Sequence, residues 1–414
     1  MTRPPASAPR ATPRTTPQLL RDRAFGPWFL GNVVSNSGNW LFNVTAAVVV
    51  FRLSGSALLV GLVSVAQFGP LLLLSPVGGA LSDRVDRRRL LLAAQAFAAA
   101  AATALAVASV VLGVEGLGAW PIVACALGIG IGQAFAAPAL NALVPALVDD
   151  PDLEAAVALT SLTFNMGRAL GPATSGVLLA TLGAEPAFVL NAVSFLVLIA
   201  ALLVVHPRPR TEPAHRDRSV RAGLRHVRAD PVLLLLLAAV AATGFAADPA
   251  ITLAPSLAQA VGGADTLAAV LVSAFGVAAV PAAAVSGRLQ RSVGSLEVAT
   301  GGCLTIAAGL VVSAVAPAPW VAVAGFGLTG VGFVLALTGF TTVLQRRVPD
   351  ALRGRVMALW SVAFLGNRPV AAVIDGAAAD RFGPRWAMLV AITVASLGAF
   401  AGVRLQRRQR AESR

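Results

Sequence analysis

Two arginines inside long apolar segments are the residues of this chain best placed to bind a ligand. Arg168 and Arg368 lie near the middle of segments long enough to span a bilayer. A charge in hydrocarbon is costly, so such a residue usually faces a cavity or a partner. A guanidinium presents a rigid fork of donors that suits carboxylate or phenolate. We predict a central site for an anionic or polar molecule; alternatively, each arginine pairs with acids or carbonyls and only holds its helices together.

Two aspartates in apolar segments are the candidate proton carriers. Asp248 precedes a proline, and Asp375 follows Arg368 by seven residues, which places it on nearly the same helical face about 10 Å away. A buried carboxyl can carry a proton, or it can stay ionised beside an arginine. Because the apolar segments contain no histidine or lysine, these aspartates are the predicted coupling groups. In the alternative interpretation, Asp375 is a loop residue near the membrane surface.

A stripe of asparagines marks one face of the first apolar segment. Its members are spaced by four, three and four residues, which aligns them along a helix: Asn32, Asn36, Asn39 and Asn43. We predict that they line a water-filled cavity, although amides also form hydrogen bonds between helices. Trp40, beside the stripe, is expected mainly to pack against apolar neighbours. Further amides assigned to the cavity are Gln67, Gln133 and Asn165.

The elements that must position these residues are membrane helices. Hydrophobic residues make up 57% of the 414 residues and charged residues 12%, against about 25% charged in soluble domains. Apolar stretches of roughly twenty residues recur along the chain, and each is long enough to cross hydrocarbon. The sequence therefore predicts an all-α membrane protein with twelve transmembrane helices, near 27–50, 56–80, 90–112, 120–143, 156–182, 186–205, 231–257, 266–287, 297–316, 320–344, 356–379 and 385–404.

The two halves of the chain repeat one another. Trp120, Gly130, Gly132, Arg168, Gly176 and Gly183 recur as Trp320, Gly330, Gly332, Arg368, Gly376 and Gly383. Such a duplication is typical of two bundles that rock around a central site. We therefore predict two pseudo-symmetric six-helix bundles at 24–205 and 230–405. A disordered cytoplasmic tail (1–23), a cytoplasmic linker (206–229) and a second tail (406–414) complete the chain, and 219–230 can form an amphipathic surface helix.

The basic residues predict the orientation in the membrane. All 32 are arginine, giving a net charge of +13. With the N-terminus inside, all but five lie in the tails or the cytoplasmic loops, as the positive-inside rule requires. Both termini are therefore predicted to be cytoplasmic, and the expected partner of these arginines is anionic lipid rather than nucleic acid. The exceptions are Arg52, Arg168, Arg368, Arg381 and Arg385.

Several function classes are disfavoured by the residues that the chain lacks. A P-loop needs its lysine, and the chain has none, so an ATP-driven pump is disfavoured. No histidine or lysine in the apolar segments could activate a serine nucleophile. Cys125 and Cys303 lie in apolar segments of opposite halves and are expected to be packed thiols. We therefore expect neither an enzyme nor a metal or cofactor site.

The loop after the second apolar segment carries a charged motif. Its predicted role is a conformational latch, because acid and arginine side chains at a helix end can pair with another helix end. In the alternative interpretation it is a charged loop that only fixes topology. The motif residues are Gly79, Asp83, Arg84, Arg87 and Arg88.

The fifth apolar segment carries small residues at a spacing of four. Gly167, Gly171 and Ser175 form a stripe that permits close helix contact. Pro172 removes a backbone hydrogen bond and can bend the helix, and Gly176 follows directly.

With these motifs the chain resembles the major facilitator superfamily. The charged loop is similar to the signature loop between helices two and three, and residues 158–176 resemble the antiporter motif, with Ala158 and Ser175 where glycine is usual. Together with APALNALVPALV (137–148) and VPDALRGRVMAL (348–359), the match resembles the enterobactin (siderophore) and drug exporter branch most. It implies two bundles that alternate between inward-open and outward-open forms, and exchange of solutes for protons.

Two departures from the family pattern bear on the coupling mechanism. The segment 120–143 contains no arginine, unlike the drug-efflux pattern, and Asn39 stands where relatives often carry an acid. The hypothesis is a monomeric, proton-coupled exporter of a small amphipathic or anionic organic molecule (a drug, antibiotic or siderophore) in a bacterial cytoplasmic membrane. An importer or uniporter is the alternative, followed by a membrane receptor or scaffold that transports nothing.

Overall fold

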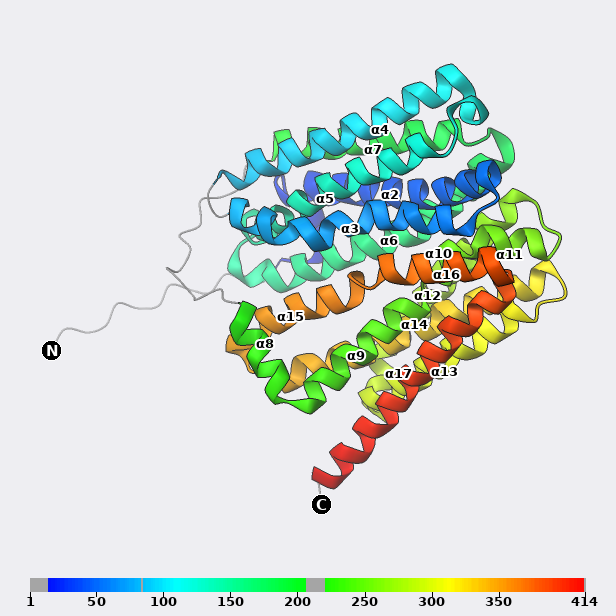
Figure 1. The fold of residues 1–414 in the computed structure, drawn as a ribbon. Helices are drawn as coiled ribbons and strands as arrows, with labels where there is room; N and C mark the ends of the chain where they lie inside the picture. Colours follow the sequence, from blue (N-terminus) through cyan, green and yellow to red (C-terminus); the bar gives the residue numbers. More distant parts are fainter. Residues whose placement is uncertain (1–13, 83–84, 206–219, 413–414) are drawn as a thin grey trace, which may run out of the picture.

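The computed structural model describes residues 14–82, 85–205 and 220–412, and within these ranges every regular element is helical. The long helices form two bundles that lie side by side, with their helices running in roughly the same direction (Figure 1). We call the end at which α2 begins and α17 ends the terminal end. The opposite end, where α2 ends and α3 begins, is called the distal end.

The N-terminal bundle has six helices. Within it α2 packs against α6 and α7, α3 packs against α5, and α4 packs against α5 and α7. The helices are α2 (Phe25–Ser54), α3 (Ala57–Ser82), α4 (Arg87–Leu117), α5 (Trp120–Leu147), α6 (Leu153–Thr181) and α7 (Glu185–Val204).

The C-terminal bundle repeats this plan with two broken helices. The predicted segment 231–257 is broken at Ala247–Asp248, and 356–379 is broken at Gly366–Asn367. A proline follows each break, at Pro249 and in the first turn of α16, and proline cannot donate the backbone hydrogen bond of a continuous helix. The helices are α9 (Pro231–Ala246), α10 (Pro249–Thr252), α11 (Ala254–Ala260), α12 (Asp265–Val293), α13 (Ser295–Ala314), α14 (Pro319–Arg347), α15 (Asp350–Leu365), α16 (Arg368–Phe382) and α17 (Pro384–Glu412).

Most of the long helices are apolar enough to span a membrane. In the described part of the chain, 10 helical stretches are long and apolar enough to cross a membrane. Helices α2 and α6, of 30 and 29 residues, are long enough but less apolar, because their sequences carry the asparagines and Arg168. The arrangement agrees with the predicted all-α membrane fold of two six-helix bundles, and each of the twelve predicted segments coincides with one of these helices or helix pairs.

The glycines of the sequence repeat make equivalent contacts in the two halves. Gly130 of α5 lies against the backbone carbonyl of Gln67 in α3, and Gly330 of α14 lies against the carbonyl of Phe275 in α12. A Cβ at either position would collide with those backbone atoms. Small residues at such crossings let membrane helices approach closely. The repeat in the sequence therefore records a repeated helix-packing geometry.

Three short elements lie at the terminal end: α1 (Thr16–Leu20), the 3₁₀ helix η1 (Asp150–Asp152) and α8 (Val220–Ala229). The helix α8 falls within the predicted amphipathic stretch, and it contacts α9 and α15. The tail predicted to be disordered differs over its described residues, 14–23. There Leu19 is fully buried in a cluster that includes Phe25 and Trp28. Burial of apolar side chains orders this part of the chain. The high arginine and proline content of the tail led to the prediction of disorder.

Candidate functional site

A small cavity lies between the two bundles, and both predicted central arginines line it. Its volume is about 20 Å³, enough for one water molecule. The N-terminal bundle contributes Trp40 and Arg168, and the C-terminal bundle contributes Phe275, Phe333 and Arg368. The sequence repeat therefore does bring the two arginines together, at the boundary between the halves.

Aromatic rings surround the guanidinium of Arg168. Its central carbon lies 4.3 Å from the ring centre of Phe333, 4.5 Å from that of Phe275 and 5.4 Å from that of Trp40. Phe275 and Phe333 belong to the opposite bundle, so these cation–π contacts cross the bundle boundary. Among the described residues, Arg168 has no acidic or hydrogen-bonding partner. Because rings cover the faces of a guanidinium, its N–H edges remain the groups that can receive an anion.

Arg368 occupies the first position of α16, directly after a helix break. Its guanidinium carbon lies 4.5 Å from the ring centre of Phe68 and 5.9 Å from that of Trp40. Trp40 therefore lies within cation–π range of both arginines. The charges of Arg168 and Arg368 repel each other, whereas Asp248 attracts Arg368. The centre thus holds two cations with one acid within electrostatic range of Arg368, an arrangement that favours a bound anion.

The two predicted proton carriers are both buried. Asp248 is 1% exposed, and one of its carboxylate oxygens accepts a hydrogen bond of 2.6 Å from the Thr252 hydroxyl. Its other oxygen and both oxygens of Asp375, which is 0% exposed, have no hydrogen-bond partner among the described residues. The carboxyls interact electrostatically across the contact between α10 and α16. Asp375 lies within α16 rather than in a surface loop.

The asparagine stripe of α2 is placed outside the central cavity. Asn32 donates to the Thr163 hydroxyl of α6 at 2.9 Å, and Asn36 donates to the carbonyl of Asn32 at 3.0 Å. Asn39 donates to the carbonyl of Ser35 at 3.1 Å, while its own oxygen has no partner among the described residues. Asn43 is half-buried on the same helix. Of these bonds, the one from Asn32 joins α2 to α6, whereas those from Asn36 and Asn39 lie within α2.

The remaining amides are scattered around the N-terminal bundle. Gln67 is 7% exposed, and its side-chain oxygen has no partner in the described chain. Gln133 is half-buried on α5. The side chain of Asn165 lies outside the described residues. None of these amides lines the central cavity as the structure describes it.

The charged loop after α3 is described only in part. Gly79 is half-buried in the last turns of α3. Asp83 and Arg84 lie outside the described residues, as does the side chain of Arg87. The guanidinium of Arg88 donates to the carbonyls of Leu202 and Leu203, at 3.1 and 2.7 Å, at the end of α7. In this conformation Arg88 therefore caps a helix of its own bundle.

The small residues of α6 form its contact with α2. A Cβ at Gly167 would lie 2.8 Å from backbone and side-chain atoms of Asn36, and one at Gly171 would lie 2.7 Å from the backbone nitrogen of Leu41. Pro172 lies inside α6 without ending it. Gly176 faces the other bundle, because a Cβ there would lie 3.2 Å from the Cβ of Ala269 in α12. The motif thus places Arg168 firmly on α6 beside Trp40.

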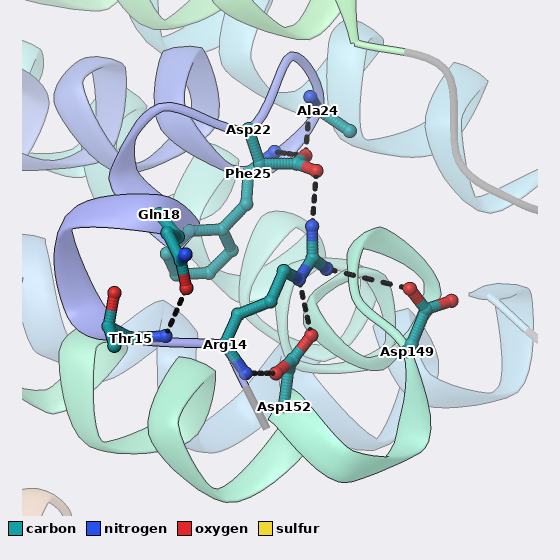
Figure 2. A network of polar contacts seen from close by, with 8 residues as sticks. All are labelled: Arg14, Thr15, Gln18, Asp22, Ala24, Phe25, Asp149 and Asp152. Carbon is teal, nitrogen blue, oxygen red and sulfur yellow. Dashed lines mark hydrogen bonds and ion pairs between the residues drawn. The ribbon is translucent and has the colours of Figure 1, made fainter. Parts of the chain in front are cut away.

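A polar network at the terminal end was not predicted from the sequence (Figure 2). Arg14 donates to Asp152 through its backbone N–H and its Nε, both at 2.6 Å, and its guanidinium also contacts Asp22 at 2.8 Å. Asp149 lies 3.6 Å from the same guanidinium. We call Arg14, Asp22, Asp149 and Asp152 the terminal clasp. It ties the segment before α2 to the start of α6.

The clasp shifts the pKa values of its members. Burial raises the pKa of Asp152, but the hydrogen bonds and charge of Arg14 outweigh it and hold that pKa below its ordinary value. The pKa of Asp22 is likewise lowered, because bonds from the Phe25 and Ala24 N–H groups and from Arg14 exceed the effect of burial. Both carboxylates therefore stay ionised at neutral pH.

Two features of the centre escaped the sequence analysis. Phe275 and Phe333 come from apolar segments in which nothing distinguishes them from core residues, and Trp40 was expected to pack rather than to meet both arginines. What distinguishes these rings from other core residues is that they surround the charge of Arg168. That position can be recognised only once the fold is known. In the described chain no three histidine, cysteine or acidic side chains gather to hold a metal ion.

The fold and the central site define a class of protein. Two pseudo-symmetric six-helix bundles, a charged site at their boundary and broken helices beside it are the architecture of major facilitator transporters. The chain is therefore a multi-pass membrane transporter of that superfamily.

Comparison with known proteins gives the family within the superfamily. A family described as "Transmembrane secretion effector" matches residues 15–413, and the chain belongs to it. A curated relative, the enterobactin exporter EntS of Escherichia coli O1:K1 / APEC, is 28% identical over 369 residues, which covers 85% of this chain and 84% of the relative.

Solved structures share the fold at low sequence identity. A bacterial homologue of the lysosomal transporter Spinster, inward-facing and unoccupied, superposes with a TM-score of 0.74 at 14% identity and covers 92% of this chain and 96% of its own. A bacterial homologue of the iron transporter ferroportin gives 0.68 in its inward-facing state, at 15% identity and 95% and 99% coverage. Its outward-facing state gives 0.60, at 16% identity and 92% and 99% coverage.

Proposed function

We propose that this transporter is a proton-coupled exporter of a small amphipathic or anionic organic molecule, such as a drug, an antibiotic or a siderophore. Transport proceeds by rocking of residues 24–205 against 230–405 around the central cavity. The observation that carries the proposal is the pair Arg168 and Arg368, which come from opposite bundles and line one cavity whose described lining contains no acidic residue. The exporter relative of similar length supports the direction.

The central site favours an anion with an apolar body. The guanidinium edges can bind carboxylate or phenolate, while Trp40, Phe275 and Phe333 offer ring surface around them. The present cavity of about 20 Å³ holds no organic solute, so the bundles must separate at one end to admit one. Binding of substrate then replaces the cation–π contacts that join Arg168 to the opposite bundle.

Protons are the proposed coupling ion, carried by Asp248 and Asp375. Their carboxylates are buried, with three oxygens lacking a partner among the described residues. An ionised carboxyl without partners in a membrane interior is unfavourable, so protonation, which removes the charge, is favoured. Asp248 also attracts Arg368, which links protonation to the substrate site. No cofactor is needed, and a monomer is sufficient for this mechanism.

The proposed location is the bacterial cytoplasmic membrane, with both termini and the terminal end in the cytoplasm. The arginine distribution supports this orientation. The terminal clasp and α8 then lie at the cytoplasmic surface, and the distal end is the outer end. The better superposition on the inward-facing form of the ferroportin homologue is consistent with a closed distal end.

Everted membrane vesicles with an acidified lumen and a pH-sensitive dye test the function. Siderophores, dyes and antibiotics are added in turn, and efflux of luminal protons is recorded for each compound. A signal that appears with one compound, and vanishes in Arg168→Ala and in Asp248→Asn at equal expression, establishes proton antiport. Full activity of Arg168→Ala would remove the substrate-site assignment.

The other outcomes distinguish the alternatives. Uptake of a labelled compound without proton movement identifies a uniporter or an importer. Binding of a compound without flux identifies a receptor or scaffold.

A further inference from the structure

We propose that Asp380 is the latch that holds the distal end of the two bundles closed. Asp380 lies in the last turn of α16, in the C-terminal bundle, and its carboxylate reaches the first turn of α3 in the N-terminal bundle. It accepts hydrogen bonds from the Ser56 hydroxyl at 2.6 Å, the Ala57 N–H at 2.6 Å and the Leu58 N–H at 3.2 Å. Three donors of one bundle thus converge on one acid of the other.

The start of α3 is a suitable receptor for a carboxylate. The first N–H groups of a helix have no partner within it, and the aligned peptide dipoles leave partial positive charge there. The Ser56 hydroxyl accepts the N–H of Leu59 at 3.1 Å, and Asp380 binds the Ala57 and Leu58 N–H groups that remain. The N-terminus of α3 is therefore capped by a side chain from the opposite bundle. Separating the bundles at this end removes that cap.

The helix surface beside the latch is shaped for close contact. Ala372, Gly376 and Asp380 are spaced by four residues, so they lie along one face of α16. A Cβ at Gly376 would lie 2.6 Å from the carbonyl oxygen of Ala57, and Gly61 of α3 lies as closely against the carbonyl of Ala372. This small-residue seam brings the two helices near enough for a carboxylate as short as aspartate to reach backbone N–H groups.

The latch is placed where it can be released. Asp380 lines a surface hollow of about 250 Å³ together with Gly55, Ala57 and Gln259. Water in that hollow can replace each hydrogen bond when the bundles part. A contact sealed inside protein would instead leave its polar groups unsatisfied on opening. The geometry therefore fits a reversible contact better than a permanent brace.

The latch acts on one side of the bundle boundary. The sequence repeat pairs Asp380 with Ala180, so the first half carries no equivalent acid. On that other side, α6 meets α12 through Gly176 and Ala269. Asp375 is buried five residues before Asp380 on α16, towards the centre of the molecule, so release of the latch also precedes access of outer water to Asp375. The latch therefore controls when that carboxyl can exchange a proton.

Distance measurements across the distal end test the latch without any substrate, so their outcome is independent of the proposed transport function. Spin labels are placed on Leu182→Cys and Val315→Cys, which are 66% and 66% exposed on opposite bundles. The buried native thiols Cys125 and Cys303 are replaced by alanine. Pulsed electron–electron double resonance then gives the distribution of distances between the two spin labels in full-length, detergent-solubilised protein.

Asp380→Asn should produce a several-fold larger population of long distances than the parent protein. Ser56→Ala, which removes one donor and leaves the carboxylate, should shift the distribution in the same direction by less. The matched control is Glu185→Gln, an acid at the same end whose carboxylate accepts the Val114 N–H at 3.4 Å within its own bundle. Its distance distribution should equal that of the parent.

Two results would overturn the proposal. One is an Asp380→Asn distribution that superimposes on the parent distribution while Ser56→Ala is also unchanged. The other is an equal shift in Glu185→Gln, which would mean that loss of any distal charge opens the bundles. Because Ser56→Ala removes only a hydroxyl, it keeps the test decisive if Asp380→Asn does not purify as a monodisperse protein.

Discussion

At the scale of single residues, the environment of Arg168 explains how a charge is tolerated between the bundles. Its guanidinium faces three aromatic rings instead of an acid, and the attraction of a cation to a ring is about 0.5–2 kcal/mol. These contacts offset only part of the cost of burial. An anionic ligand would offset the remaining cost of burying this charge, which is the physical reason for proposing an anionic substrate here.

The planar shape of Arg168 should matter as much as its charge. We expect Arg168→Lys to lower transport more than tenfold, because an ammonium cannot stack between rings while offering a bidentate edge. The control is Arg404→Lys, since Arg404 also lies 4.6 Å from a ring, that of Phe400, but at the exposed end of α17. Initial rates in everted vesicles at matched expression measure both. Equal rates for Arg168→Lys and the parent would show that charge alone suffices.

The terminal clasp should make stability depend on pH. Asp152 has a lowered pKa in the folded protein, so its contribution is complete above the unfolded value of about 3.9 and is lost as pH falls through the folded pKa. We expect Asp152→Asn to lower the free energy of unfolding by about 1.5–3 kcal/mol at pH 7, the range for a hydrogen bond to a charged group. Thermal unfolding in detergent between pH 7 and pH 3 measures this.

The difference between parent and Asp152→Asn should shrink towards pH 3, where the parent carboxylate begins to take up protons. A difference that stays constant over this range would contradict the assignment of an ionised Asp152. Asp86→Asn is a useful comparison, because Asp86 only caps α4 within its own helix through the Arg89 N–H.

At the scale of helices, the small residues of α6 decide how near Arg168 comes to α2. A methyl group at Gly171 would meet the Leu41 nitrogen at 2.7 Å and the Ser37 carbonyl at 2.8 Å, so the helices would have to move apart. We expect Gly171→Ala to destabilise the protein by about 1–3 kcal/mol, as overpacking does, and to displace Trp40 from the arginines. Gly301→Ala, in α13, is the matched control because nothing lies within 4 Å of its added carbon.

Thermal unfolding of the two alanine variants in one detergent separates packing from helix propensity. Alanine favours a helix over glycine, so Gly301→Ala should unfold at the parent temperature or slightly above it. Equal melting temperatures for both variants would show that α6 has room to shift.

The helices were predictable from sequence because their signal is local. Apolar length defined all twelve segments, and the repeat of Gly130 and Gly330 anticipated equivalent packing in the two halves. The breaks before Pro249 and Pro369 were not assigned, since proline is also tolerated inside membrane helices, as Pro172 is within α6. Whether a proline breaks or bends its helix depends on neighbouring elements that the local sequence does not specify.

The site was predictable only in its charges. Arg168 and Arg368 stand out because arginine is rare in hydrocarbon, and the repeat required them to meet. Phe275 and Phe333 resemble many other core residues in sequence, so their position beside Arg168 follows from tertiary packing alone. Asp380 received no role from the sequence, because its partners at the start of α3 are more than three hundred residues away.

At the scale of the whole molecule, electrostatic interactions join the proposed substrate site to both proposed proton carriers. Arg168 and Arg368 lie at the centre, Asp248 acts on Arg368, and Asp375 interacts with Asp248. In the proposed mechanism, a proton on Asp248 removes the charge that attracts Arg368, and Asp375 acts on Arg368 only through Asp248. A transporter with this arrangement can exchange the two ligands without any direct contact between them.

Replacing one of the proposed proton carriers should therefore abolish proton-driven export while leaving the exchange of substrate for substrate intact. We expect Asp375→Asn to lose at least tenfold of its proton-driven export, because the amide cannot release a proton. It should retain exchange of labelled for unlabelled substrate, since that process needs only the rocking motion. Glu185→Gln, whose carboxylate accepts the Val114 N–H within the N-terminal bundle, should retain both activities. Everted vesicles, with and without a pH gradient, measure the two processes for the same variant.

If Asp375→Asn kept full proton-driven export, Asp248 alone would have to carry the proton. If the variant lost both processes equally, Asp375 would instead be required for the rocking motion itself.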